Sequence, residues 1–230
     1  MADTTARSDA RGVLFDIDGT LVDTTYLHAV AFWQAFRQFG HDVPMAQIHR
    51  GIGMGSDKLV PHVLGEDRDE AQDEDLQHAH SSLYSVYWER LRPLPGAVDL
   101  MRACKERGLK VVLASSASAD ELKALRAALD AEDLIDVATG SADAEGSKPE
   151  PDILEAALAK SGLSAQNVVF VGDSVWDVEA AGRLDIPCVG LESGGTSAAE
   201  LTGKGAVEAY SDPADLLAAL DSSTLGKLLV

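Results

Sequence analysis

A short apolar run near the start of the chain, residues 13–18, is broken by two carboxylates and is followed by a glycine turn. The carboxylates are Asp16 and Asp18, and Gly19 and Thr20 follow them. An apolar run of this length that ends in a glycine turn predicts a buried strand. Polar groups at the end of such a strand lie at the carboxyl edge of a sheet, where open α/β folds build their sites. We therefore expect an α/β fold with a site at this edge.

The closeness of Asp16 and Asp18 has an electrostatic consequence. Two carboxylates this close repel each other unless a cation lies between them or one of them stays protonated. A hard cation with a preference for oxygen ligands, such as Mg²⁺, is the natural partner. A solvated Asp-x-Asp-Gly turn is the alternative for an isolated match, so the rest of the chain has to decide between the two interpretations.

The charge of the chain excludes some classes of partner. The 230 residues have a formal net charge of −19, which argues against nucleic acid and against an anionic membrane surface as partners. A phosphorylated substrate would be repelled overall, so it needs a local cation. No apolar run approaches the ~20 residues of a membrane span, and the polar start of the chain lacks the apolar segment of a signal peptide. We expect a cytoplasmic protein that is a monomer or a homodimer.

Residues 25–92 show helical periodicity and no convincing strand, which predicts an inserted all-helical cap. The longest of its helices is predicted to bury a stripe of apolar side chains that ends at Pro93. The members of this stripe are Leu76, Leu83, Val86, Tyr87 and Leu91. The predicted domains are therefore a core of residues 1–24 and 93–230 and a helical cap of residues 25–92.

From residue 97 onward, helical and strand-like segments alternate. Strands are predicted at 110–114 and 168–171, with weaker ones at 188–191 and 207–210. Ser118 and Glu121 predict a capping box for the helix after the first of these strands. Alternation of this kind is typical of a doubly wound, Rossmann-like parallel sheet with helices on both faces.

Further polar residues follow the predicted strands. Ser115 and Ser116 come directly after residues 110–114, and Asp173 comes directly after residues 168–171, with Asp177 one helical turn later. Lys148 lies in a loop rich in glycine and proline ahead of a helix start. The ends of parallel strands share one edge of a sheet, so we expect all five side chains to converge on one crevice.

These residue types suit phosphoryl transfer. An anionic nucleophile that attacks a phosphate monoester needs Mg²⁺ and an ammonium group to offset repulsion. Asp16 is the candidate nucleophile, forming an aspartyl-phosphate, and Asp18 the candidate acid and base. The candidate metal ligands are Asp16, Asp173 and the main-chain carbonyl of Asp18. The candidate phosphate ligands are Ser115, Ser116 and Lys148, and Asp177 would orient Lys148 or a metal-bound water from behind.

Four ordered segments resemble the motifs of the haloacid dehalogenase superfamily, in its branch with a small helical cap. They are DIDGT, Ser115 after VVLA, Lys148 in SKPEPD, and VGDSVWD. The resemblance covers residues 13 to about 220 and implies a Mg²⁺-dependent hydrolase with the roles just described.

Within this superfamily, the chain resembles the branch of phosphoglycolate phosphatases and beta-phosphoglucomutases. Asp18 argues for phosphate chemistry, since dehalogenases of this fold lack a carboxylate there. Gly172-Asp173 is the pattern usual in the phosphatases, whereas the mutases tend to carry Glu-Asp. Ser115-Ser116 departs from the Thr-Asn common in phosphoglycolate phosphatases, which puts phosphoglycolate itself in doubt.

Three functions remain open at this point. The first is a phosphatase that acts on a small phosphorylated metabolite, and the second is a phosphomutase that passes through a bisphosphorylated intermediate. The third is a non-catalytic phosphoacceptor module, against which Asp18 and the helical insertion argue.

The predicted cap contains two substrate-contact candidates. His28 would lie on its first helix close to the hinge, and Arg50 lies beside the Gly-rich break 51–55. For the other histidines we expect surface or partly buried helix positions. Trp176 is predicted either to wall the crevice or to pack on its own helix.

Overall fold

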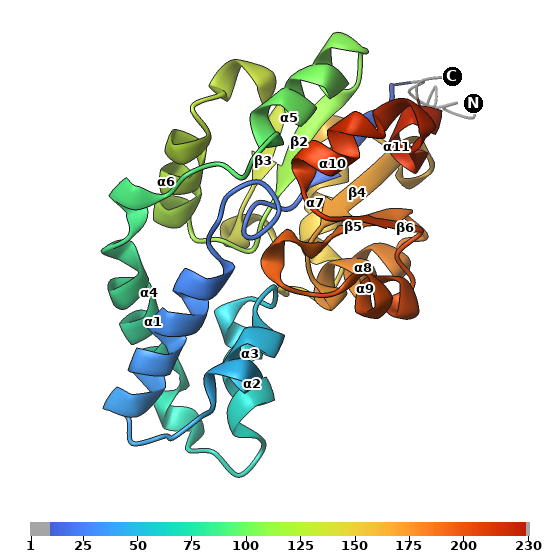
Figure 1. The fold of residues 1–230 in the computed structure, drawn as a ribbon. Coiled ribbons are helices and arrows are strands. Elements are labelled where there is room, and N and C mark those ends of the chain that lie inside the picture. Colours follow the sequence, from blue (N-terminus) through green and yellow to red (C-terminus); the bar gives the residue numbers. More distant parts are fainter. Residues whose placement is uncertain (1–9, 229–230) are drawn as a thin grey trace, which may run out of the picture.

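The computed structural model describes residues 10–228 and shows a six-stranded parallel sheet with helices on both faces (Figure 1). The strand order is β3-β2-β1-β4-β5-β6. The predicted doubly wound α/β class is therefore confirmed. The strands are β1 (Gly12–Phe15), β2 (Lys110–Ala114), β3 (Val137–Thr139), β4 (Val168–Gly172), β5 (Cys188–Leu191) and β6 (Glu208–Tyr210).

The register of the central strands determines where the polar residues emerge. Phe15, the last residue of β1, pairs with Leu113 of β2 and with Val171 of β4. All three strands run parallel, so they end at the same edge of the sheet. Asp16 and Asp173 therefore leave the sheet side by side.

Alternation of side chains along the strands divides the core into two layers. In β1, Val13 and Phe15 pack with one set of buried residues, whereas Leu14 packs with the other. The first layer includes residues of α5 (Ala97–Glu106), α6 (Ala119–Leu129), α10 (Pro213–Ala218) and α11 (Thr224–Lys227). The second includes residues of α7 (Asp152–Ser161), α8 (Val175–Gly182) and α9 (Ala198–Lys204). Parallel sheets need this cover on both faces, because their strands are apolar on both sides.

Residues 25–85, which we call the helical insertion, lie between β1 and β2 in the sequence and below the sheet in Figure 1. The helices are α1 (Thr25–Gln38), α2 (Met45–Gly51), α3 (Ser56–Leu64) and α4 (Asp73–Ser85). They share an apolar core of their own, to which Phe32 and Phe36 contribute. The domain boundaries at residues 24/25 and 92/93 stay a prediction, and residues 1–9 of the predicted core lie outside the described residues.

The last cap helix differs from the prediction. It ends at Ser85, and Val86 is 63% exposed rather than buried. The buried stripe of α4 consists of Leu76, His80 and Tyr84, which are spaced four residues apart. The chain leaves the α-helix at Val86 and forms a short 3₁₀ turn at Trp88–Arg90, so the helical spacing that was extrapolated to Leu91 does not continue.

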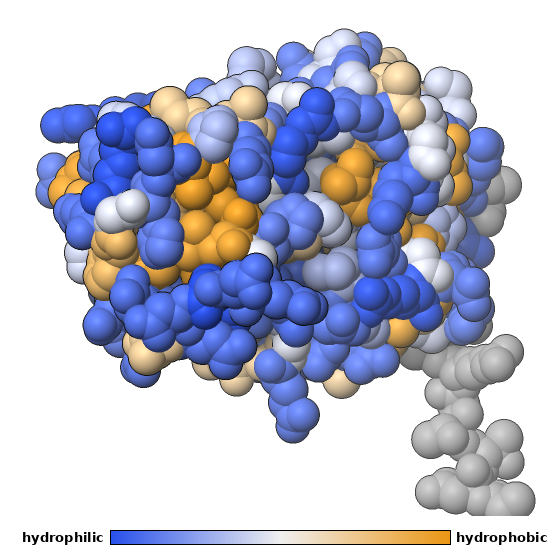
Figure 2. Space-filling model, turned by 90° about the horizontal axis from the view of Figure 1, so that it is seen from below, coloured by the Kyte–Doolittle hydropathy of each residue, from blue (hydrophilic) through white to orange (hydrophobic). Residues whose placement is uncertain are grey.

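The face of the molecule shown in Figure 2 is mostly hydrophilic, with hydrophobic areas set between hydrophilic side chains. Within residues 10–228, no helix has the length and apolar character needed to cross a bilayer.

Candidate active site

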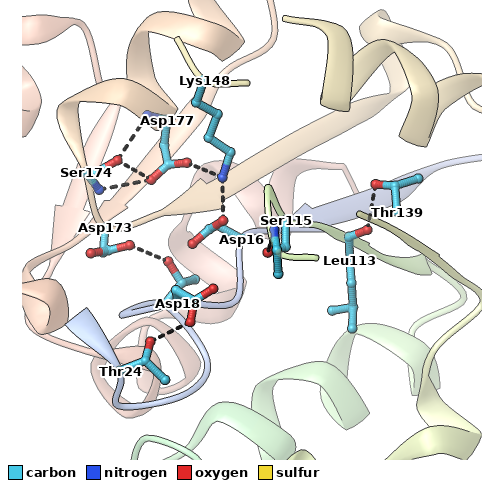
Figure 3. A network of polar contacts seen from close by, with 12 residues as sticks. Asp16, Asp18, Thr24, Leu113, Ser115, Thr139, Lys148, Asp173, Ser174 and Asp177 are labelled. Atoms are coloured by element: carbon cyan, nitrogen blue, oxygen red, sulfur yellow. Dashed lines mark hydrogen bonds and ion pairs between the residues drawn. The ribbon is translucent and has the colours of Figure 1, made fainter. Parts of the chain in front are cut away.

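Asp16 and Lys148 form the centre of the site. Asp16 follows β1 directly, and its side chain accepts a hydrogen bond from Lys148 Nζ (Figure 3). Lys148 is only 1% exposed and also pairs with Asp177 Oδ1 at 2.7 Å. Burial opposes the charge of Lys148, but these two carboxylates outweigh it and raise the pKa of the ammonium group. Lys148 is therefore a fixed positive charge beside the candidate nucleophile.

Asp177 both pairs with Lys148 and caps the helix α8. Its Oδ2 accepts hydrogen bonds from Ser174 Oγ at 2.6 Å and from the Ser174 backbone N–H at 3.0 Å. The Ser174 hydroxyl in turn accepts from the Asp177 N–H, which completes a capping box at the start of α8. Helix capping thus fixes the carboxylate that holds Lys148.

Asp173 lies where two glycines let the backbone approach it. Its Oδ1 accepts a hydrogen bond from Thr20 Oγ1 at 3.0 Å. A Cβ atom at Gly194 would lie 1.6 Å from Asp173 Oδ2, and one at Gly19 would lie 2.5 Å from it. Gly19 also has a φ of +75°, a conformation that glycine adopts without strain. Both positions therefore require glycine if this carboxylate is to keep its place.

The carboxylates of Asp16, Asp173 and Asp177 each have an oxygen within 4.8 Å of the others. Burial raises the pKa of Asp16 to about 7, although Lys148 opposes the shift. Burial also raises the pKa of Asp173 well above its usual value, and the charges of Asp177 and Asp16 add to the shift. Three buried carboxylates, of which the Lys148 ammonium pairs with two, are short of positive charge, and an all-oxygen donor set is the set that Mg²⁺ takes. The residues present therefore fit a hard divalent cation.

Asp18 has different surroundings from Asp16. Its Oδ1 accepts a hydrogen bond from Thr24 Oγ1 at 2.7 Å and lies 3.2 Å from His28 Nε2. Burial would raise the pKa of Asp18, but the contacts with His28 and Thr24 outweigh it and lower the pKa. Burial lowers the pKa of His28, but the carboxylates of Asp18, Glu121 and Asp16 together outweigh it, so the net shift is upward. These shifts favour a protonated His28 ring beside an ionised Asp18.

The sequence did not predict that His28 belongs to a larger cluster. Its Nε2 lies 3.4 Å from Glu121 Oε1, and its Nδ1 lies 3.1 Å from His80 Nε2. Tyr84 stacks on the His28 ring at 3.8 Å. His80 is buried rather than at a surface or partly buried position, because α4 turns it inward with Leu76 and Tyr84.

The predicted capping box of α6 involves a contact that the sequence did not predict. Ser118 caps the helix by accepting from the Glu121 N–H, and the Glu121 carboxylate lies near the Ser118 backbone N–H and also 3.4 Å from His28 Nε2. Burial raises the pKa of this carboxyl to about 7, against the opposing charge of His28. Thr20 and Thr24 were also missed, and their signal was present: both hydroxyls follow Asp18 within six residues.

A cavity of about 330 Å³ opens between the sheet edge and the helical insertion. Asp16, Asp18 and Lys148 line it together with Ser115 and Ser116. The Ser116 hydroxyl is buried and has no hydrogen-bond partner within residues 10–228, which leaves it available to a ligand.

Arg50 does not line this cavity, and its contact with the substrate stays a prediction. Its guanidinium pairs with Glu200 of α9, and its side chain is 64% exposed. Trp176 does not line this cavity either, and its indole N–H donates to the Arg50 carbonyl at 3.1 Å. Both residues join the helical insertion to the core.

Comparison with known proteins decides the family. The model of the haloacid dehalogenase-like hydrolases matches residues 10–185. The chain belongs to this family. It is therefore a hydrolase, as the resemblance of its four motifs predicted.

Relatives within the haloacid dehalogenase-like hydrolases cover most of the chain. A phosphoglycolate phosphatase of Escherichia coli (strain K12) is 30% identical over 210 residues, which is 81% of this chain and 82% of that protein. A hydrolase from Pseudomonas syringae is 33% identical with a TM-score of 0.87, covering 93% of this chain and 98% of that one. A beta-phosphoglucomutase from Clostridium difficile, at 19% identity and a TM-score of 0.76, covers 89% and 92% of the two chains and shares the fold.

Proposed function

We propose that this hydrolase is a Mg²⁺-dependent phosphatase that acts on a small organic phosphate monoester through an aspartyl-phosphate. The observation that carries the proposal is the contrast between Asp16 and Asp18 at one end of the cavity. Asp16 pairs with the Lys148 ammonium, whereas Asp18 pairs with the His28 ring. Two carboxylates in unlike environments can take unlike roles, one as nucleophile and one as acid and base.

In the first step, a carboxylate oxygen of Asp16 attacks phosphorus, and the bond from phosphorus to the leaving oxygen breaks. Asp18 passes a proton to that oxygen, and the protonated His28 ring, 3.2 Å from Asp18 Oδ1, would supply it. In the second step, Asp18 takes a proton from water as the water attacks phosphorus, and Asp16 is released with inorganic phosphate. Lys148, Ser115 and Ser116 would bind the phosphate oxygens.

Asp16 and Asp173 would hold Mg²⁺, with the main-chain carbonyl of Asp18, and the neighbouring Asp177 would keep Lys148 in position. When bound, the ion would offset the negative charge that gathers between phosphate and nucleophile. The donor set supports this assignment, because every candidate ligand atom is an oxygen.

A screen of phosphorylated metabolites with and without Mg²⁺ tests the proposed function. We expect Mg²⁺-dependent release of inorganic phosphate from at least one small monoester. A phosphomutase would instead form an isomeric sugar phosphate, and a phosphoacceptor module would turn over no ester. Either outcome would contradict the proposal.

Mg²⁺ should stabilise the protein more at pH 8 than at pH 5.5. The pKa of Asp16 is raised in the folded state, so its contribution to stability is present below about pH 4 and is lost as the pH rises towards 7. The metal-free protein should therefore have a lower Tm at pH 8 than at pH 5.5. At pH 8 the bound cation would take the place of the proton that Asp16 has lost. Thermal unfolding with and without Mg²⁺ measures both effects.

Asp173→Asn provides the control for this measurement, since it removes one candidate ligand and its charge. Its Tm should respond less to Mg²⁺ than that of the unchanged protein. Equal gains in Tm at the two pH values would contradict the assignment of Asp16 and Asp173 to the cation.

A further inference from the structure

Acidic side chains outnumber basic ones in the lining of the cavity, and this excess limits which leaving groups the cavity can bind. Besides Asp16 and Asp18, it is lined by the carboxylates of Asp57, Glu121 and Glu145. Among the described residues that line the cavity, Lys148 alone carries an ammonium or guanidinium group. This group already pairs with Asp16 and Asp177. A second negative group on the substrate would have no free fixed cation to meet.

The two histidines that line the cavity do not change this balance. His28 Nε2 lies between the carboxylates of Asp18 and Glu121, at 3.2 and 3.4 Å. Its charge is therefore already matched. Burial, together with the neighbouring His28, lowers the pKa of His80 well below its usual value, and its ring stacks on Phe32 at 3.7 Å. His80 is neutral at physiological pH.

Cations of the helical insertion near the cavity do not reach into it. Arg50 pairs with Glu200 on the outer side, and Lys58 does not line the cavity either. Trp176 donates to the Arg50 carbonyl and stands edge-on to His62 at 5.3 Å, which ties this stretch to α8. The distal end of a substrate would consequently meet the acidic and neutral side chains of α3, α4 and α6.

The neutral part of the lining is rich in hydrogen-bonding groups. It includes Ser56, Gln77, Ser81, Ser118 and Ser147. Ser56 Oγ donates to Gln77 Oε1 at 3.3 Å, which leaves the amide N–H groups of Gln77 as donors. Hydroxyls and amides pair with the hydroxyl groups of a ligand, each donating and accepting.

We infer that the leaving group is an uncharged alcohol with several hydroxyl groups, a polyol or a sugar, and that it bears neither a carboxylate nor a second phosphate. This inference rests on the proposed phosphatase function and narrows it to one class of ester. A negative group placed against Glu121, whose side chain is only 15% exposed, would lose hydration without gaining a cation, a cost that a site uses to reject a wrong ligand. The lack of a free cation among the described residues of the cavity lining also argues against a mutase, because the bisphosphorylated intermediate of a mutase needs a second phosphate site.

Comparison of kcat/KM between esters tests the inference. We expect the values for glycerol 3-phosphate or hexose 6-phosphates to exceed those for phosphoglycolate and for hexose bisphosphates by at least about tenfold, since one unpaired buried charge is worth more than one decade. A preference for either anionic ester, or for phosphoethanolamine, would overturn it. Absence of hydrolysis of every ester, p-nitrophenyl phosphate included, would instead refute the proposed phosphatase function.

A charge-insertion variant makes the test local. Gln77→Arg puts a guanidinium group at the cavity wall and should raise the ratio of kcat/KM for phosphoglycolate to that for the neutral ester about tenfold, through KM. His78→Arg adds the same charge at the next residue of α4, which is exposed and does not line the cavity. This control should leave the ratio unchanged.

Ser81→Arg repeats the insertion at an exposed position that lines the cavity, so the test does not depend on the folding of one variant. An unchanged ratio in folded Gln77→Arg and Ser81→Arg would overturn the inference. So would an equal rise in His78→Arg, because net charge alone would then explain the selectivity.

Discussion

Asp16→Asn should reduce kcat by about 10⁴-fold or more while the protein stays folded. The substitution keeps the shape of the side chain at the end of β1 but removes the nucleophilic oxygen, and loss of a residue on which the covalent step depends costs this order of rate. Steady-state release of inorganic phosphate measures the loss. Circular dichroism and the Tm establish that the fold is kept.

Asp23→Asn is the matched control for this variant. Asp23 lies seven residues further along in the same segment and is exposed, so its kcat should be that of the unchanged protein. Acid-quenched reactions with ³²P-labelled substrate should show a protein-bound phosphoryl group for the control and none for Asp16→Asn. Retention of the label in Asp16→Asn would assign the nucleophile to another residue.

Asp18→Asn should lower kcat by about 10²- to 10⁴-fold for an alkyl phosphate, the range of a positioned general acid or base. The alkoxide that leaves an alkyl ester needs a proton, whereas p-nitrophenolate leaves without one. Formation of the aspartyl-phosphate from p-nitrophenyl phosphate should therefore suffer less than its hydrolysis. We expect a burst of p-nitrophenol, measured by stopped flow, followed by slow turnover.

The leaving-group dependence separates a chemical role of Asp18 from a structural one. A variant that only disturbed the fold would slow both esters alike and show no burst. Unchanged turnover of the alkyl ester by Asp18→Asn would contradict the acid and base role altogether.

Strands and strand ends were predictable because their pattern is local. The apolar runs that became β1, β2 and β4 are bounded by the polar residues that the register then brings to one edge. Asp16 and Asp173 could be grouped from this rule alone, since parallel strands end together, whereas Lys148 lies in the loop between β3 and α7. The catalytic roles of these residues stay predictions.

Contacts between distant elements were not predictable in the same way. Glu121 satisfied a local capping pattern, but its side chain also contacts His28, which lies 93 positions earlier in the chain. His80 faces inward because it lies four residues from both Leu76 and Tyr84 on the buried stripe of α4. Arg50 was placed near the substrate from its position beside a Gly-rich break, whereas its partner Glu200 lies 150 positions away. Side-chain direction in each case depends on packing that a local pattern does not contain.

The position of β1 between β2 and β4 affects how the chain matures on the ribosome. Its β4 edge pairs only with residues 168–171, so a nascent chain of about 160 residues would present an open apolar edge. Such edges favour aggregation. The segment 25–85, with an apolar core drawn from its own residues, can collapse earlier. We therefore expect the helical insertion to fold before the sheet is complete, because β4 and the strands after it lie in the last third of the chain.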